Sequence, residues 1–143
     1  MLTLENDSGT SHLARAFAHA DARLKSLEDC INRGKMPLLP ETVDATIAIV
    51  QDLMAAYVAD AGKKGVPDST ADLLEVFKAL VRGEPSWHAI RDNCRELVYY
   101  RNCINMGRPD ALPPVPEKMA VRTARHVFFY VRTRCIQEGR LKD

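Results

Sequence analysis

Apolar residues recur at intervals of three and four along most of this 143-residue chain. That spacing places them on one face of an α-helix, which completes a turn about every 3.6 residues. The first such run contains Leu13, Phe17, Ala20, Leu24, Leu27 and Ile31. Glycines and prolines separate the runs and predict five helices, over residues 10–33, 41–61, 69–81, 87–106 and 117–138. The sequence therefore predicts an all-α fold, a single up-down bundle of about five helices.

The predicted helix ends follow from residues that start or stop helices. Gly34 and Gly107 come directly after two of the apolar runs, where glycine commonly ends a helix. Asp68 or Ser69 can cap the third helix, and Ser86 can cap the fourth. No stretch alternates apolar and polar residues as a half-buried strand does, so we expect one helical domain over residues 1–143, with residues 1–9 as a flexible N-terminus.

The second predicted helix has small residues opposite its apolar face. Its large apolar residues share one side, while the other side holds Ala45, Ala48, Asp52, Ala55, Ala56 and Ala59. Small side chains let a neighbouring helix approach closely. The helix over residues 41–61 is therefore expected to be central.

Composition narrows the class of protein. Hydrophobic residues make up 46% and charged residues 27%, which is typical of a globular chain. No apolar run approaches the roughly 18 residues of a membrane span, and the N-terminus has no basic region or apolar core of a secretory signal. The four cysteines are scattered, which favours reduced thiols in a cytoplasmic protein. His12 and His19 share no evident acidic partner, so we expect neither a metal site nor a cofactor.

Charge is distributed unevenly. Residues 101–143 contain nine Lys or Arg and four Asp or Glu, a net charge of +5, while residues 1–100 contain eleven against fifteen, a net charge of −4. This asymmetry suits an anionic partner. It also suits two parts of one bundle that attract each other.

The fourth predicted helix has an arginine on its apolar face. At 100° per residue its apolar face contains Trp87, Ile90, Cys94, Leu97, Val98 and Ile104. Arg101 lies in the middle of that face, and Asn105 lies one turn further on. A buried, unpaired guanidinium would cost several kcal/mol, so Arg101 pairs with a carboxylate, reaches solvent, or lines a pocket or dimer cleft. Tyr99, Tyr100 and Cys103 occupy the other side, which predicts a helix apolar on two sides, at the bundle centre or at a subunit interface.

Residues 90–107 resemble the helix that carries the motif of HEPN domains. These domains are five-helix bundles, commonly dimeric; many are RNases and others are partners of nucleotidyltransferases. Their signature is an arginine and a polar residue, usually Asn, followed by a histidine that often precedes Gly or Tyr. Arg101, Asn102 and Gly107 match this pattern, but Met106 stands where the histidine is expected. Because methionine has no titratable proton, the resemblance implies a degenerate member without RNase activity, with a nucleotide, RNA or partner bound near Arg101.

The fifth predicted helix carries a basic stripe. Lys118, Arg122, Arg125 and Arg132 share one face, with Phe129 and Ile136 between them. Such a face can bind phosphates and stack a base, or anchor a protein partner. Alternatively, the arginines pair with acidic residues of the first three helices while Phe129 and Ile136 pack on another helix.

The sequence contains no glycine-rich phosphate loop and no Gly-x-Ser-x-Gly motif, and we assign no catalytic residue. We expect a non-enzymatic homodimeric interaction module that binds another protein and no membrane. The alternative is a degenerate HEPN-like domain that binds a nucleotide or RNA. The candidate binding residues are Arg101, Asn102, Asn105, Tyr100, Arg122, Arg125, Phe129 and Arg132.

Overall fold

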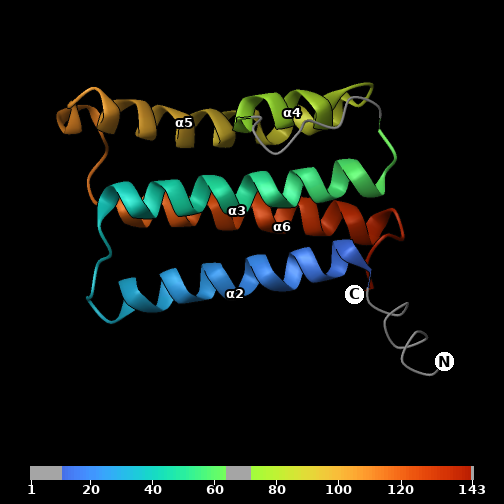
Figure 1. Ribbon diagram of the computed structural model, residues 1–143, viewed down its shortest axis with the longest axis horizontal. Helices are drawn as coiled ribbons and strands as arrows, with labels where there is room; N and C mark the ends of the chain where they lie inside the picture. Colours follow the sequence, from blue (N-terminus) through green and yellow to red (C-terminus); the bar gives the residue numbers. More distant parts are fainter. Residues whose placement is uncertain (1–10, 64–71, 143) are drawn as a thin grey trace.

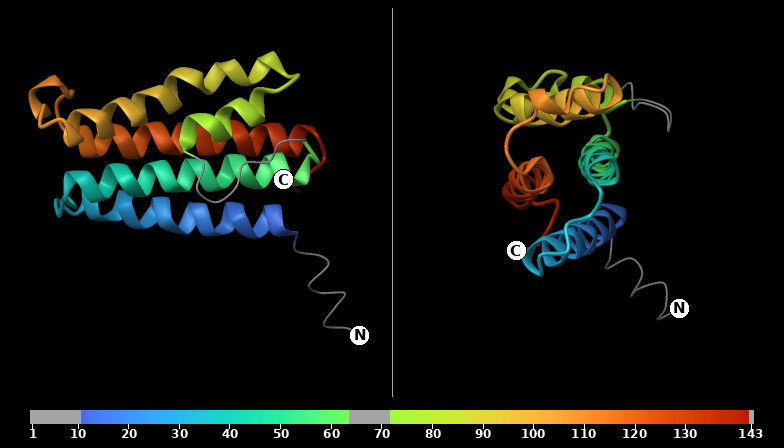
Figure 2. Two further views of the ribbon diagram at one scale, coloured as in Figure 1. Left: turned by 45° about the horizontal axis from the view of Figure 1, so that its top comes forward. Right: turned by 90° about the vertical axis from the view of Figure 1, so that its left-hand side faces the viewer.

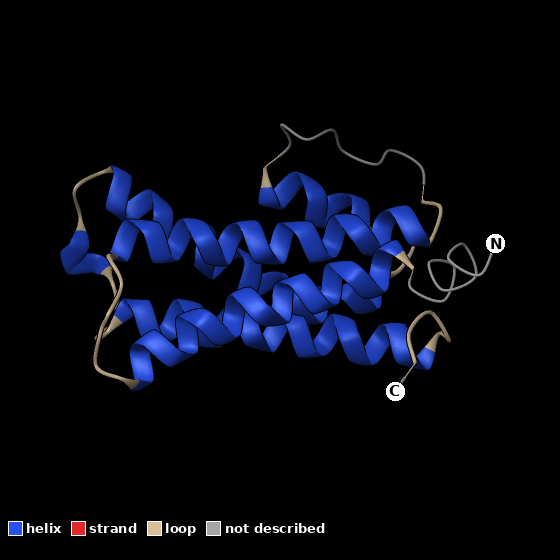
Figure 3. Cartoon of the chain, turned by 60° about the horizontal axis from the view of Figure 1, so that its bottom comes forward, coloured by secondary structure: helices blue, strands red, loops and turns tan. Residues whose placement is uncertain are grey.

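The structure is a computed structural model, and it describes residues 11–63 and 72–142. Within these ranges the chain is helical with no strand, which confirms the all-α bundle (Figure 3). The expected flexible segment 1–9 lies outside the described residues. The α-helices are α2 (His12–Asn32), α3 (Leu39–Asp60), α4 (Leu73–Val81), α5 (Arg91–Asn105) and α6 (Pro116–Gln137), with short 3₁₀ turns η1 (Pro85–Ile90) and η2 (Pro109–Ala111).

The helices α3 and α6 lie side by side in the middle of the molecule, with α2 on one side and α4 and α5 on the other (Figures 1 and 2). α2 is antiparallel to α3, and α5 is antiparallel to α6. α4 runs in the same direction as α3, so the C-terminal ends of α3, α4 and α6 meet at one end of the bundle (Figure 1). The passages from α2 to α3 and from α5 to α6 lie together at the opposite end.

α3 is the central helix, as its small residues predicted. It packs against α2, α4, α5 and α6. By length and composition α3 is the one described helix apolar enough to cross a membrane, and most of that apolar stretch is buried inside the bundle. Its buried residues are Thr42, Val43, Thr46, Ile47, Ile49, Val50, Leu53, Met54, Ala56, Tyr57 and Val58.

Two predicted helix starts are replaced by others. α4 is capped by Asp72, whose carboxylate accepts a 2.9 Å hydrogen bond from the Glu75 amide; the predicted caps at positions 68 and 69 lie outside the described residues. Ser86 was expected to cap a helix starting at Trp87, and this is wrong because residues 85–90 form η1 and α5 begins at Arg91. A proline near the start of that segment and a tight turn displace the helix by one turn.

The other predicted ends are confirmed. Gly107 follows α5 with a φ of +67°, and Gly34 follows α2 with a φ of +72°. This left-handed conformation is accessible to glycine without a steric penalty, so glycine ends both helices. α2 begins at His12 with the Ser11 hydroxyl capping the Ala14 amide at 3.0 Å.

Candidate interaction site

One end of the bundle is closed by paired charges at and just beyond the C-terminal ends of α3 and α6 and in the turn between α4 and η1. Glu138 accepts hydrogen bonds from the Tyr57 hydroxyl at 2.8 Å, Arg134 Nε at 2.9 Å and Arg140 Nε at 2.7 Å. Glu84 binds Arg134 Nη2 at 2.7 Å and Lys63 Nζ at 2.5 Å. We call this the charged end; it consists of Asp60, Lys63, Glu84, Arg134, Glu138 and Arg140.

The positive and negative side chains of the charged end balance one another. Its three cations face three carboxylates, and Arg134 also stacks 4.2 Å from the Trp87 ring centroid. The hydrogen bond from Lys63 holds the pKa of the Glu84 carboxyl below its usual value, although burial acts in the other direction. These charges therefore join helix ends within one chain.

The opposite end is apolar on its surface. Of the six large hydrophobic side chains exposed in the described part of the chain, five lie in or beside the α2–α3 and α5–α6 connections. Met106 and Leu38 are the most open, at 73% and 67% exposed. Figure 1 shows both connections at the same end of the molecule. We call this the apolar end; its residues are Met36, Leu38, Tyr99, Met106 and Val115.

Backbone geometry keeps these side chains outward. Val115 is the only non-glycine residue with a positive φ in the described ranges, at +48°, and it immediately precedes Pro116, where α6 begins. Leu38 is the extended residue before α3, and its carbonyl accepts a 2.8 Å hydrogen bond from the Thr42 hydroxyl. Their side chains therefore project from turns that the prolines and helix starts fix in place.

A hollow of about 420 Å³ opens beside Tyr99 at this end. The Tyr99 hydroxyl donates a 3.1 Å hydrogen bond to the Ala111 carbonyl, which ties α5 to η2. Arg108 forms two hydrogen bonds to Asp110, at 3.0 and 3.1 Å, so its charge is already balanced. The lining residues are Tyr99, Asn102, Cys103, Met106, Arg108 and Ala111.

α5 buries residues from both of its expected apolar sides, and of the residues on those sides only Tyr99 is exposed. Its buried residues are Cys94, Leu97, Tyr100 and Cys103, which form one broad face. The face is broad because α5 packs against α3, α4 and α6 at once. At 100° per residue Arg101 lies within that face, between Leu97 and Cys94, and it is half-buried near the end of the helix.

The α5 candidates occupy different environments. The Arg101 side chain is half-buried and forms no ion pair or hydrogen bond with a described residue. Asn102 is exposed and lines the Tyr99 hollow, and Asn105 is exposed at the helix end. Tyr100 is buried and donates a 2.5 Å hydrogen bond to Glu96, and burial followed by this bond raises its pKa. Tyr100 therefore belongs to the core.

The α6 candidates also separate. Arg125 binds Glu28 at 2.8 and 3.0 Å and Asp21 at 2.8 Å, both on α2, and stacks near Phe128 and Phe129. The arrangement matches the alternative in which arginines pair with acidic residues of the earlier helices. Phe129 is instead 54% exposed and does not pack into another helix. Arg122 is exposed and lines a hollow of about 360 Å³ between α2 and α6, while Arg132 is half-buried.

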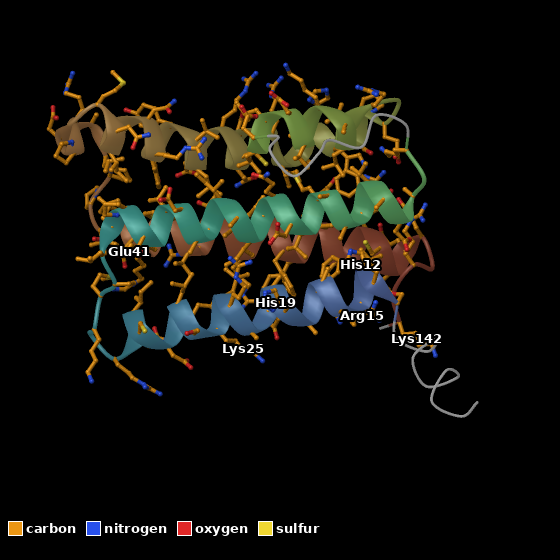
Figure 4. All side chains as sticks on the ribbon, viewed as in Figure 1. His12, Arg15, His19, Lys25, Glu41 and Lys142 are labelled. Carbon is orange, nitrogen blue, oxygen red and sulfur yellow. The ribbon has the colours of Figure 1, made fainter. Side chains whose placement is uncertain are left out.

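The histidines of α2 do not build a metal site. His12 and His19 line a shallow groove with Arg23 and Asp52, and the described residues contain no group of His, Cys, Asp or Glu that could hold a metal ion. Figure 4 shows His12 toward one end of the molecule and Glu41 toward the other, at the apolar end.

Sequence reasoning missed most of the apolar end. A signal was present, because Met36, Leu38 and Val115 are apolar residues flanked by prolines, where no helix can bury them. Met106 was considered only as a replacement for histidine. No protein-family model, no characterised protein and no solved structure matches this chain. The assignment of function therefore depends on the geometry alone.

Proposed function

We propose that this chain is a non-enzymatic interaction module that forms a homodimer through its apolar end. The observation that carries the proposal is the gathering of five of six exposed large hydrophobic side chains at that end. Exposed apolar side chains gathered at one end of a folded chain suit a protein-binding surface. The long sides of the bundle expose only Phe129 among the large hydrophobic residues described.

The surroundings suit an isologous interface, in which the same patch contacts itself. A stable interface buries about 800 Å² per partner, so it must extend beyond the five apolar residues into a polar rim. Arg101, Asn102 and Asn105 supply that rim on α5, and Glu41 supplies an exposed carboxylate at the start of α3. In a symmetric pair, Arg101 of one copy can meet a carboxylate of the other. This would satisfy a guanidinium that has no described partner within its own chain.

Self-association can be measured by sedimentation velocity and by light scattering across a concentration series. The natural chain should dimerise, and Leu38→Lys together with Met106→Lys should give a monomer. Phe129→Lys is the matched control, because it makes the same change at the exposed hydrophobic residue outside the apolar end. A monomeric natural chain at high concentration, or loss of the dimer only in Phe129→Lys, would contradict the proposal.

A second candidate function follows from Arg101. The Arg101 guanidinium is half-buried and has no described partner, and the next residue, Asn102, lines the Tyr99 hollow. A guanidinium in this position is suited to an anionic ligand. This favours the HEPN-like alternative, in which the chain binds a nucleotide or RNA without cleaving it. Titration with nucleotides and short RNA at low salt should then show binding that Arg101→Ala abolishes and Arg95→Ala, at an exposed position on the same helix, leaves unchanged. Absence of binding at low salt excludes this function.

A further inference from the structure

A hollow of about 530 Å³ lies between α4 and η1, on the outer side of the bundle next to the charged end. Its apolar lining comes from Phe77, Val81 and Pro85. Its cationic lining comes from Lys78 and Arg82, with His88 beside them. None of these residues belongs to the apolar end.

Helix geometry explains why the lining of the hollow is partly apolar and partly basic. Phe77 and Val81 are four residues apart on α4 and form an apolar row, with Lys78 beside Phe77 on the helix and Arg82 directly after the helix end. Across the hollow, Pro85 and His88 are three residues apart in a 3₁₀ turn, where such positions align. The His88 ring meets the Phe77 ring edge to face, with centroids 6.2 Å apart, and closes the floor.

The charge of the hollow is positive. Among the residues that the structure describes, Glu84 is the one lining carboxylate, and this group is held by Lys63 and Arg134 of the charged end. Lys78 is exposed and makes no ion pair with a residue in the described ranges. Arg82 has an interaction of its own within the chain, so the argument depends on Lys78.

We propose that this hollow binds a small organic anion, with an apolar body against Phe77 and Val81 and one carboxylate at Lys78. The volume lies within the range of about 300–1,000 Å³ that small-molecule sites occupy. An apolar floor binds the body of such a molecule by removing it from water, and the cation fixes its orientation. The site is independent of dimerisation.

Naphthoate is a suitable probe, with naphthamide as its uncharged counterpart of the same shape. Calorimetry measures the affinity and the stoichiometry of both compounds. Naphthoate should bind once per chain and up to about fivefold more tightly than naphthamide, because one ionic contact near the surface is worth up to about 1 kcal/mol. Equal affinity of the two compounds, or no saturable binding, overturns the proposal.

Variants locate the binding. Lys78→Glu should weaken naphthoate about fivefold or more and leave naphthamide unchanged, whereas Lys118→Glu makes the same charge change outside the hollow and should have no effect. Val81→Phe fills the floor and should weaken both compounds, with circular dichroism confirming that the helices are retained. Met106→Lys should leave binding unchanged, which separates this site from the apolar end. If Lys118→Glu or Met106→Lys weakens binding as much as Lys78→Glu does, naphthoate binds elsewhere and the proposal is wrong.

Discussion

Arg134 is the residue at which the charged end can be tested for its contribution to stability. Its side chain is 16% exposed and hydrogen-bonds Glu84 at 2.7 Å, Glu138 at 2.9 Å and Ser86 at 2.9 Å. Its guanidinium also stacks 4.2 Å from the Trp87 centroid. Arg134→Met keeps most of the aliphatic stem and removes these polar contacts and the charge.

The expected loss can be worked from these contacts. Charge-assisted hydrogen bonds are worth about 1.5–3 kcal/mol when dry, but the two carboxylates are a quarter to a third exposed, so we reduce each bond to about 0.5 kcal/mol. The cation–π contact adds about 0.5–1 kcal/mol. Glu84 keeps Lys63 and Glu138 keeps Arg140, so no carboxylate loses its last cation. The free energy of unfolding should therefore fall by about 2 kcal/mol.

Urea unfolding followed by Trp87 fluorescence and by circular dichroism measures this loss. With a slope of about 2 kcal/mol per molar urea, the midpoint should fall by about 1 M. Arg23→Met is the control, because its ion pair with Asp52 at 3.2 Å is exposed to solvent and should contribute less than about 0.5 kcal/mol. If both variants lose the same small amount, the charged end does not hold the helices together.

Three further results are expected. Burial alone would raise the pKa of the Glu138 carboxyl, but hydrogen bonds from two arginines and a tyrosine hold this pKa below its ordinary value. The stability that this carboxylate contributes is therefore present above about pH 4.3 and is lost as the pH falls further. A urea midpoint that stays unchanged down to about pH 3 would contradict this. Val115→Gly should stabilise the chain by about 0.5–1 kcal/mol in the same urea assay, because glycine accepts a φ of +48° without strain; a loss of stability would refute the strain argument. Burial raises the pKa of the Cys94 and Cys135 thiols to about 12, so Ellman's reagent should label the partly exposed Cys30 first in the folded chain; rapid labelling of all cysteines would mean that the core opens.

Periodicity predicted the helices well and the exposure of single residues less well. α2, α3 and α6 follow their predicted spans closely because each has a stripe of apolar residues bounded by glycine or proline. Both apolar sides expected for α5 contribute buried residues, but periodicity did not predict that Tyr99 is exposed. With three helices around it, α5 buries Tyr100 and Cys103 as well as Cys94 and Leu97.

The candidate sites show the same limit. The basic stripe of α6 was visible in the sequence, but nothing local to it indicates that Arg125 is held by Asp21 and Glu28, about one hundred residues earlier. Such a pairing depends on the packing of α2 against α6, which is a feature of the tertiary structure. The apolar end was readable in principle, since proline-flanked hydrophobic residues cannot be explained by burial in a helix. The sequence alone does not show that the α2–α3 and α5–α6 connections, far apart in the chain, lie at the same end of the bundle.

The contrast between the two ends gives the strongest reason to regard the apolar end as functional. At the charged end, Lys63, Arg134 and Arg140 each have a carboxylate partner in their own chain, so one copy suffices to complete it. At the apolar end, hydrophobic side chains face outward, and Val115 does so from a backbone conformation that costs about 1 kcal/mol or more for a β-branched residue. Strain and exposure together are destabilising for an isolated chain. They are compensated if a second copy buries the side chain, so Val115→Gly should raise stability at low protein concentration and weaken self-association at the same time.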